Sequence, residues 1–396
     1  MEDKKLLEGI RVVDATIALA GPAASQRMAD MGADIIKVES PTGDFSRNYT
    51  ISNAWVNHIS IGFLALNRNK RSIVVNLKTP GSSEVIARLV STADIFLQNF
   101  RPGVAKRLGL DYEHLSQYNP GLVYVQISGY GQTGKYADLP GQDLLLQAMS
   151  GVMWNVGRLN DPPIPSSVYA TDVIASHLAV EGALTAYIHR LRTGQGQLVD
   201  VNMLGGLLDA QCQELSAYFN AGVVPTRGKE MHGHTLLAPP YGVYSTNDRY
   251  IVIAMGDLSS VEKALKIQAG LLSNKDPMIF RDEIYRIIQS SIANRSADEV
   301  LNDLREHGLW VGPVETYEDL KVNPQVEECE LLINLEHPEA GQLKLPGLPI
   351  RFNGQNPQPY RPPSKLGEHT IEILREAGFT SEDITRLRNE GVLVPD

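Results

Sequence analysis

The sequence predicts an α/β protein in which short buried strands alternate with helices. The first observation is a β-α-β unit, with strands expected at Ile10–Thr16 and Asp34–Glu39 and a small-residue helix at Ala23–Met31. The second is the return of this pattern, because apolar runs at Asp94–Gln98 and Val123–Ser128 each precede a loop. Ligands collect at the carboxyl ends of strands in open α/β sheets, so we expect these loops to carry function.

The other elements of the first half continue the alternation. Residues Pro41–Gly62 are irregular, as long surface excursions that carry function often are. Beyond them, apolar patterns predict strands at Ile73–Leu77 and Leu198–Val201 and helices at Pro80–Ser91, Leu144–Met153, Thr171–Leu191 and Met203–Phe219.

The pattern changes in the second half, which predicts a smaller second domain from about Thr226 to Thr316. A hairpin is expected from the paired runs Tyr241–Ser245 and Tyr250–Ala254, and helices with polar faces follow over Val261–His307. The last part is rich in proline, which is typical of an extended arm lying along another surface. It ends in a predicted helix at Glu368–Ala377.

The composition is that of a globular chain whose charge disfavours some partners. Of its 396 residues, 43% are hydrophobic and 21% are charged. With 36 basic and 46 acidic residues the net charge is -10, which disfavours a general attraction to nucleic acid or to anionic membranes. An anionic ligand would therefore need a local basic site.

Cysteine content and hydropathy predict a cytoplasmic protein. The two cysteines, Cys212 and Cys329, fit neither a disulfide framework nor zinc-ligand spacing. His232 and His234 flank a glycine without further ligands nearby, so we interpret them as loop residues and expect no bound metal. No apolar stretch approaches the roughly 18 residues that cross a bilayer, so neither membrane insertion nor secretion is expected.

Several basic residues are candidates for a local anion site. Arg68, Lys70, Arg71 and Lys78 lie close together in the sequence, although a solvated loop rim explains this pattern equally well. Arg47, in the irregular stretch, is a candidate for binding a second carboxylate of a substrate.

Asp172 is the candidate nucleophile because it lies in an apolar setting at the start of a long helix. It belongs to the stretch PIPSSVYATDVIA, and the apolar spacing that follows places it at the N-cap or in the first turn. On spacing alone, a capping aspartate is the favoured interpretation. The positive end of a helix favours the charged form of a carboxylate, so we expect Asp172 to stay ionised.

Ten motifs occur in a specific order along nearly the whole chain: LEGIRVVDAT, LAGPAA, MGADIIKVES, LNRNKRSIVVNLK, ADIFLQNFRPG, ISGYGQTG, QAMSG, ATD, RTGQGQ and PSKLGEHT. In this order the chain resembles the family III CoA-transferases, which include formyl-CoA transferase, carnitine CoA-transferases, succinyl-CoA:dicarboxylate transferases and α-methylacyl-CoA racemase. The resemblance implies a large Rossmann-like domain at 1–220, a smaller α+β domain at 226–325 and a C-terminal segment at 326–396 that returns to the large domain. It also implies two chains interlocked as rings.

The resemblance implies that coenzyme A or an acyl-CoA binds as a substrate, with no permanently bound cofactor. Lys78 and Arg107 match family positions near the CoA phosphates, where cations are needed even in an acidic protein. The positions that match the adenine and pantetheine path are Ala20, Val75, Asn99, Phe100 and Leu108. Ser40 departs from the pattern, since some members have an adenine-stacking arginine there.

Asp172 falls on the nucleophilic aspartate of the family. A carboxylate that attacks a thioester forms a mixed anhydride, and CoA can convert this anhydride into an aspartyl-CoA thioester. The racemase branch uses a histidine in a G-H-D motif, which here is Gly141-Gln142-Asp143. Because glutamine cannot usefully take up a proton, we expect Gln142 to donate a hydrogen bond to substrate or intermediate and Asp143 to play a supporting role.

The sequence therefore predicts a transferase that moves CoA from an acyl-CoA donor, with succinyl-CoA as one candidate, to a free carboxylic acid. Leu19 replaces a glutamine of formyl-CoA transferase, which favours a larger, partly apolar acyl group. Two alternatives stay open: a non-catalytic CoA-binding subunit of a heteromeric transferase, and an acyl-CoA racemase or isomerase. The expected partners are acyl-CoA and small carboxylic acids, without nucleic acid or membrane, in a homodimer or in a heteromer with a paralogous subunit.

Overall fold

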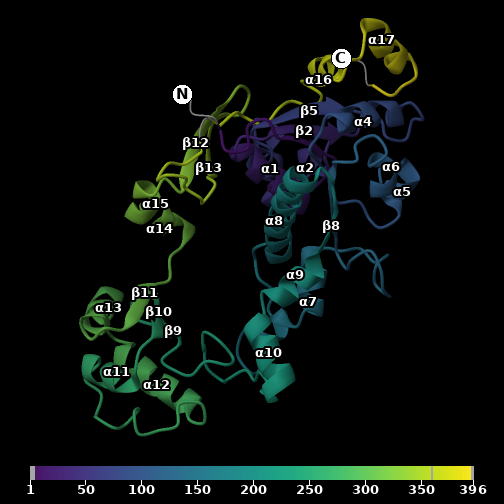
Figure 1. The fold of residues 1–396 in the computed structure, drawn as a ribbon. Coiled ribbons are helices and arrows are strands. Elements are labelled where there is room, and N and C mark those ends of the chain that lie inside the picture. The colour runs from purple at the N-terminus through teal and green to yellow at the C-terminus, as the bar shows by residue number, and fades with distance from the viewer. Residues whose placement is uncertain (1–4, 358–359, 394–396) are drawn as a thin grey trace. The chain divides into compact units, whose positions relative to one another are not determined.

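Figure 1 shows the computed structural model, which describes residues 5–357 and 360–393. The chain divides into two compact units. The first comprises Met1–Leu146, Tyr169–Leu207 and Glu327–Asp396, and the second comprises Gln147–Val168 and Leu208–Val326. Each unit buries its own clusters of apolar side chains, so each has a core of its own.

The first unit is built on a six-stranded parallel sheet. Its strands, in spatial order, are β5 (Lys70–Val74), β2 (Asp34–Glu39), β1 (Arg11–Asp14), β6 (Ile95–Gln98), β7 (Val123–Ser128) and β8 (Leu198–Asn202). Counted along the chain, this is the order 3-2-1-4-5-6 of a Rossmann-like sheet, which confirms the predicted fold class. The strand order reverses between β1 and β6, so the switch point lies there.

Helices cover both faces of this sheet. On one face α1 (Ala20–Asp30) packs against α8 (Ala170–Thr193), and the alanines of α8 bring the two helices and the sheet close together. The other face is covered by α4 (Ser82–Ser91), α16 (Thr370–Glu376) and α17 (Ser381–Asn389). The sequence predicted the first four of these helices and missed α17.

The basic run at β5 is part of the sheet and not an anion site. Arg68, Lys70 and Arg71 are all buried, at 3%, 4% and 7% exposure. Their ion-pair partners include Asp30, Asp14 and Asp34, respectively. The predicted anion site is wrong for these three residues, because their charges are neutralised within the fold. The same pairing lets β5 begin at Lys70, three residues before the expected start.

The C-terminal segment is only partly the extended arm that its prolines predict. Residues 361–365 form neither helix nor strand and lie along β5, with a hydrogen bond from Asn69 N–H to the Arg361 carbonyl at 3.0 Å. The turn that follows is held to β5 by a hydrogen bond from His369 N–H to the Ser72 carbonyl at 3.0 Å. This segment covers the free edge of the sheet. The prediction is wrong for β12 (Leu332–His337) and β13 (Gly341–Pro346), which form a hairpin because alternate apolar side chains pack into a small core.

The second unit contains a three-stranded antiparallel sheet covered by helices. The strand order is β11 (Trp310–Pro313), β10 (Tyr250–Met255), β9 (Gly242–Ser245), which confirms the predicted hairpin. Three helices supply most of the core beside it: α11 (Leu258–Ala264), α12 (Arg281–Ile292) and α13 (Ala297–Glu306).

Short elements complete the described chain. The helix predicted over Met203–Phe219 is broken into two helices, α9 (Met203–Asp209) and α10 (Cys212–Ala221). The remaining elements are α2 (Phe45–Asn48), β3 (Trp55–Val56), β4 (Ile59–Ser60), α3 (Ile61–Leu66), α5 (Val104–Leu108), α6 (Tyr112–Leu115), α7 (Asp143–Met149), α14 (Tyr317–Leu320), α15 (Pro324–Glu328) and single 3₁₀ turns at Ile51–Asn53 and Val152–Asn155.

The backbones of Gly129 and Gly141 lie in close contact. A Cβ atom on Gly141 would lie 2.4 Å from the Cα of Gly129, so Gly141→Ala must displace backbone. We expect this change to destabilise the fold by about 1–3 kcal/mol in urea unfolding, the range for overpacking. Gly312→Ala is the matched control, because Gly312 has open space around it, and it should stay within about 0.5 kcal/mol of wild type. Equal stabilities of the two variants would contradict the packing described here.

Candidate active site

The switch point brings together the loops that follow β1 and β6. The side-chain amide of Asn99 donates to the Ile17 carbonyl at 2.8 Å, and its Oδ1 accepts the Ile17 N–H at 3.0 Å. This double hydrogen bond fixes the start of the loop that leads into α1. Ligands of open α/β sheets bind in the crevice at such a point, which makes the carboxyl ends of β1 and β6 the candidate site.

A buried ion pair holds the same loop from a second direction. Lys37 and Asp44 pair at 2.7 Å with side-chain exposures of 2% and 0%. The Lys37 ammonium also donates to the Thr16 carbonyl at 2.9 Å, and Asp44 accepts the Ala18 N–H at 3.1 Å. Burial raises the pKa of Asp44, but Lys37 and the backbone N–H groups of Ser46 and Ala18 together outweigh burial and hold that pKa below its ordinary value. These bonds keep Ala18 in a left-handed conformation, with φ at 68°, just before α1 begins.

Asp172 lies in the first turn of α8, next to the N-terminus of α1. The N-cap residue of α8 is Tyr169, so Asp172 is not the capping residue. Burial, followed by the negative charge of Asp143, raises the pKa of Asp172 to about 6. The backbone N–H groups of Ala20 and of Asp172 itself favour the ionised form but do not offset these two effects.

The helix N-terminus acts on Asp172 in the expected direction, because its N–H groups favour the carboxylate, but it does not decide the net shift of the pKa. The pKa is raised, not lowered, because removing water from a half-buried carboxylate costs more than nearby N–H groups return. A carboxyl group with a pKa of about 6 is still mostly ionised at neutral pH. Asp172 thus combines a negative charge with incomplete hydration.

Hydrogen bonds between Thr171 and Asp143 hold the start of α8 in place. Asp143 accepts the Thr171 N–H at 2.9 Å and the Thr171 hydroxyl at 2.5 Å, as a supporting carboxylate would. Both residues are buried. Gln142 is exposed, and its Oε1 accepts the Leu144 N–H at 3.2 Å. No described residue accepts a hydrogen bond from its NH₂ group, so Gln142 can donate to a ligand.

The residues expected to bind CoA follow the carboxyl ends of β1, β5 and β6, but they could contact a ligand in different ways. Ala20 and Val75 are 2% and 0% exposed, so neither offers side-chain surface to a ligand. Lys78 and Arg107 are exposed, and neither side chain has an ion-pair partner among the described residues. The side chain of Asn99 is already engaged with Ile17. Two further positions pack partly buried against the core: Phe100 and Leu108.

Sequence reasoning missed the groups that hold the loop. Lys37 is the central polar residue of the apolar strand DIIKVE, and a lysine in a buried strand needs a buried partner. That signal was available, although it does not identify Asp44 as the partner. Ser128, at the carboxyl end of β7, was also missed; its hydroxyl is buried and has no hydrogen-bond partner among the described residues.

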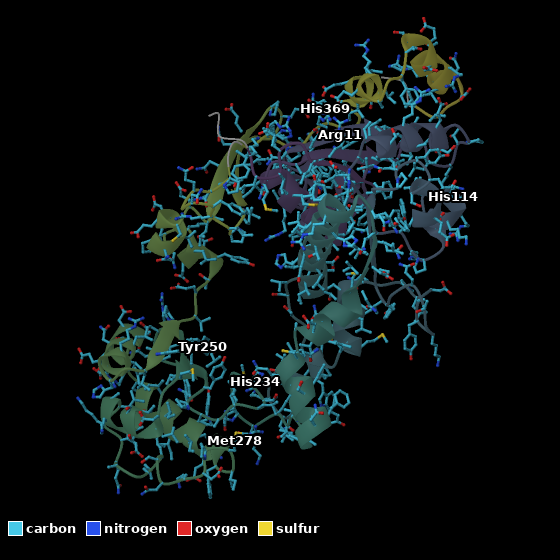
Figure 2. All side chains as sticks on the ribbon, in the orientation of Figure 1. Arg11, His114, His234, Tyr250, Met278 and His369 are labelled. Carbon is cyan, nitrogen blue, oxygen red and sulfur yellow. The ribbon has the colours of Figure 1, made fainter. Side chains whose placement is uncertain are left out.

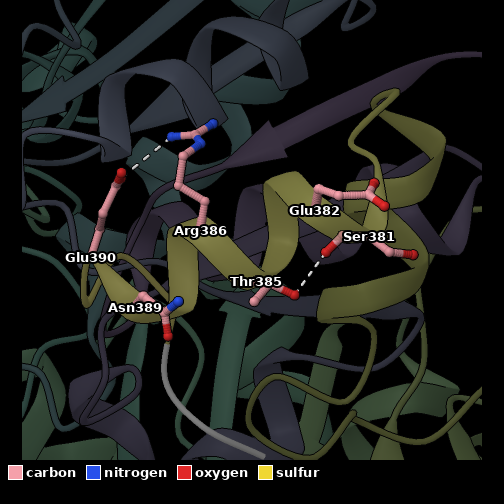
Figure 3. A pocket seen from close by; sticks show the side chains of 6 residues that line it. All are labelled: Ser381, Glu382, Thr385, Arg386, Asn389 and Glu390. Carbon is pink, nitrogen blue, oxygen red and sulfur yellow. Dashed lines mark hydrogen bonds and ion pairs between the residues drawn. The ribbon is translucent and has the colours of Figure 1, made fainter.

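A surface hollow at α17 is not a candidate active site. Figure 3 shows its lining side chains, which come from α17 and its C-cap residue Glu390. They are engaged by neighbouring residues: the Thr385 hydroxyl donates to the Ser381 carbonyl at 2.9 Å, and Arg386 pairs with Glu84 of α4 at 2.9 Å and with Glu390 at 3.4 Å. An open face of a single exposed helix supplies no enclosed group for chemistry.

His232 and His234, which flank Gly233, each contact a carboxylate. His232 contacts Asp282 at 2.9 Å, and His234, labelled in Figure 2, contacts Glu214 at 3.0 Å. In residues 5–357 and 360–393, no group of three or more histidine, cysteine or acidic side chains could hold a metal ion. Over the same residues, no helix has the length and apolar character required to span a membrane.

Comparison with known proteins identifies the family. Residues 7–370 match the model of CoA-transferase family III. The succinyl-CoA:glutarate CoA-transferase of Mus musculus is 32% identical over 402 residues, covering 99% of this chain and 91% of that protein. The succinate–glutarate CoA-transferase of Agrobacterium fabrum is 36% identical over 394 residues, covering 94% and 96%.

Solved structures agree with this assignment. The crystal structure of a CAIB/BAIF family protein from Brucella suis matches with a TM-score of 0.82 and 30% identity, covering 94% of this chain and 99% of that one. The similarity in sequence and in fold thus extends over nearly the whole chain. The chain belongs to CoA-transferase family III and is a CoA-transferase.

Proposed function

We propose that this CoA-transferase moves CoA from an acyl-CoA donor to a free carboxylic acid with Asp172 as its nucleophile. The observation that carries the proposal is the half-buried carboxylate of Asp172, beside the N-terminus of α1 at the ligand-binding edge of the sheet. Incomplete hydration leaves less water to be displaced when a carboxylate attacks.

The reaction proceeds by exchange between anhydrides and thioesters. A carboxylate oxygen of Asp172 attacks the thioester carbonyl of the donor, the C–S bond breaks, and CoA leaves as a thiolate, so a mixed anhydride remains. The thiolate then attacks the aspartyl carbonyl and releases the donor acid, which leaves an aspartyl-CoA thioester. The acceptor carboxylate attacks this thioester and again frees the thiolate. Attack of the thiolate on the acceptor's acyl carbon completes the new acyl-CoA and restores Asp172.

Each of these steps passes through an oxyanion, which requires hydrogen-bond donors placed in advance. The backbone N–H of Ala20 already interacts with the Asp172 carboxylate. We assign to it, and to the free NH₂ group of Gln142, the stabilisation of charge on substrate and intermediate. Gln142 also makes racemisation by a histidine at this position impossible, because an amide does not exchange protons with an α-carbon.

The proposed donor is the CoA thioester of a small dicarboxylic acid such as succinate. This proposal is supported by the relatives named for succinyl-CoA and glutarate. Arg47, the residue suggested for the second carboxylate, is paired within the fold: Glu39 accepts from its Nε at 2.7 Å and from its Nη2 at 2.8 Å, so its charge is already balanced. The exposed cations Lys78 and Arg107 are assigned to the CoA phosphates.

We further propose a cytoplasmic dimer of interlocked chains, formed with a second copy or with a paralogous subunit. Large apolar side chains that are exposed in the second unit support a partner surface there, because an interface would remove their apolar area from water. They include Phe219 at 75%, Ile279 at 75%, Tyr317 at 85% and Val322 at 82% exposure.

Removing the nucleophile tests the mechanism. We expect Asp172→Ala to lower kcat by at least about a thousandfold, as loss of a covalent nucleophile does. In the wild type, acyl-CoA plus hydroxylamine should inactivate the enzyme and leave a hydroxamate at Asp172 that peptide mass spectrometry detects. The control Asp209→Ala changes an acidic residue at the end of α9 and should react as the wild type does. Full transfer activity in Asp172→Ala would refute the mechanism.

The pH dependence of kcat/KM tests the environment of Asp172. Since the carboxylate form attacks, protonation abolishes the reaction, and a pKa of about 6 places this loss between about pH 7 and pH 5. Asp143→Asn removes a charge that raises the pKa of Asp172 and keeps an oxygen that can accept from Thr171. We therefore expect the acidic limb to move to lower pH in this variant.

A matched control separates this effect from general loss of charge. Asp138→Asn changes an exposed acidic residue of the preceding loop and should leave the acidic limb where it is. If the limb of Asp143→Asn coincided with that of Asp138→Asn, the assigned coupling between Asp143 and Asp172 would be wrong.

A further inference from the structure

A second cavity lies where the C-terminal segment runs along the edge strand β5. Its volume is about 200 Å³, and it lies between this segment and the end of β12. The polar side chains that the following argument uses are His337, Arg361, Lys365, Glu368 and His369. None of them belongs to the residues assigned to CoA or to acyl transfer. We call this space the edge cavity.

His337 is a buried residue that lines the edge cavity. The residue is 5% exposed. Its Nδ1 accepts the N–H groups of Glu339 at 3.1 Å and Ala340 at 3.0 Å. A ring nitrogen that accepts carries no proton, so the proton of the neutral ring must be on Nε2. No described residue accepts a hydrogen bond from Nε2, so this N–H group can donate to a ligand.

His369, labelled in Figure 2, has the same tautomer for the same reason. Its Nδ1 accepts the Ser72 N–H at 3.4 Å, and its own N–H donates to the Ser72 carbonyl at 3.0 Å. The ring is therefore held against β5 with Nε2–H left over. The structure thus borders the edge cavity with two imidazole N–H groups whose orientation is set by backbone contacts.

Arg361 adds a positive charge. Its backbone is fixed to Asn69, which accepts the Arg361 N–H at 2.6 Å and donates its own N–H to the Arg361 carbonyl at 3.0 Å. The guanidinium group has no hydrogen bond or ion pair with any described residue. A guanidinium presents a planar fork of donors that matches the oxygens of a carboxylate or a phosphate.

Two acidic side chains limit what the edge cavity can hold. Lys365 is paired with Glu339 at 2.7 Å, so its charge is largely neutralised. The Glu368 carboxylate accepts the Lys365 N–H at 2.8 Å and stays close to the lining. Lys70, which also lines the cavity, is paired with Asp14 at 3.4 Å. With Arg361 unpaired beside Glu368, the lining has too little positive charge to balance a polyphosphate. Directed N–H donors with little net charge suit a small anion with few charges.

We propose that the edge cavity binds a small free oxyanion, either a carboxylate or inorganic phosphate, through Nε2 of His337, Nε2 of His369 and the guanidinium of Arg361. The bound anion would join the β12–β13 hairpin to the C-terminal segment on β5. This proposal does not depend on the role assigned to Asp172.

Isothermal titration calorimetry of the full chain tests this site with two probes, inorganic phosphate and acetate, each titrated separately. We expect saturable binding of at least one probe, weakened about tenfold or more in Arg361→Gln, which loses a charge-assisted contact. His337→Asn should weaken binding as well, because the asparagine Oδ1 can replace the acceptor Nδ1 while the Nε2–H donor is lost. Arg305→Gln, which removes an exposed arginine of α13, is the control and should bind as the wild type does.

The comparison between probes identifies the source of the oxyanion: tighter binding of phosphate assigns the site to inorganic phosphate, and tighter binding of acetate assigns it to a carboxylate. Transfer activity at saturating CoA substrate should be the same in Arg361→Gln and in the wild type, which also shows that this variant folds. The proposal is overturned if neither probe binds saturably, or if Arg361→Gln and His337→Asn both bind with the wild-type affinity.

Discussion

The buried ion pair between Lys37 and Asp44 is the interaction on which the geometry of the candidate active site depends. Lys37 comes from β2 and Asp44 from the loop after it, and together they bind the Thr16 carbonyl and the Ala18 N–H. Neither side chain is accessible to water that could replace its partner, and breaking such a pair costs about 3–5 kcal/mol. The pair therefore fixes where α1 begins, and with it the backbone N–H of Ala20.

The site balances two opposed influences on Asp172. Burial and the charge of Asp143 favour its protonated form, whereas the N–H groups at the helix ends favour the carboxylate. Because the pKa of Asp172 reaches about 6 and no higher, the group stays charged at neutral pH while it is incompletely hydrated. Both properties suit a carboxylate that must attack a thioester, so the environment of Asp172 serves the proposed chemistry better than a simple capping role.

Local patterns in the sequence predicted the helices and strands whose apolar residues recur periodically. They failed where ion pairs between residues far apart in the sequence determine the structure. The bounds of β2 and β7 follow from their apolar runs, and the long helix α8 follows from its spacing. The start of β5 could not be predicted, because Lys70 and Arg71 look solvent-exposed until Asp14 and Asp34 are placed beside them. The candidate site was predicted from the order of motifs, but the raised pKa of Asp172 depends on its burial, which the motifs do not give. The partner of Lys37 depends on how the loop after β2 folds back, which the sequence does not reveal.

The central claim is that the carboxylate of Asp172 becomes covalently involved in each transfer, and its oxygen atoms provide the most direct test. In the proposed reaction, one Asp172 oxygen leaves with the donor acid in every cycle and one acceptor oxygen takes its place. After turnover with an acceptor acid labelled with heavy oxygen in its carboxylate, the peptide that contains Asp172 should carry the label, and the released donor acid should carry it in later cycles. An unlabelled Asp172 after many turnovers would contradict the account.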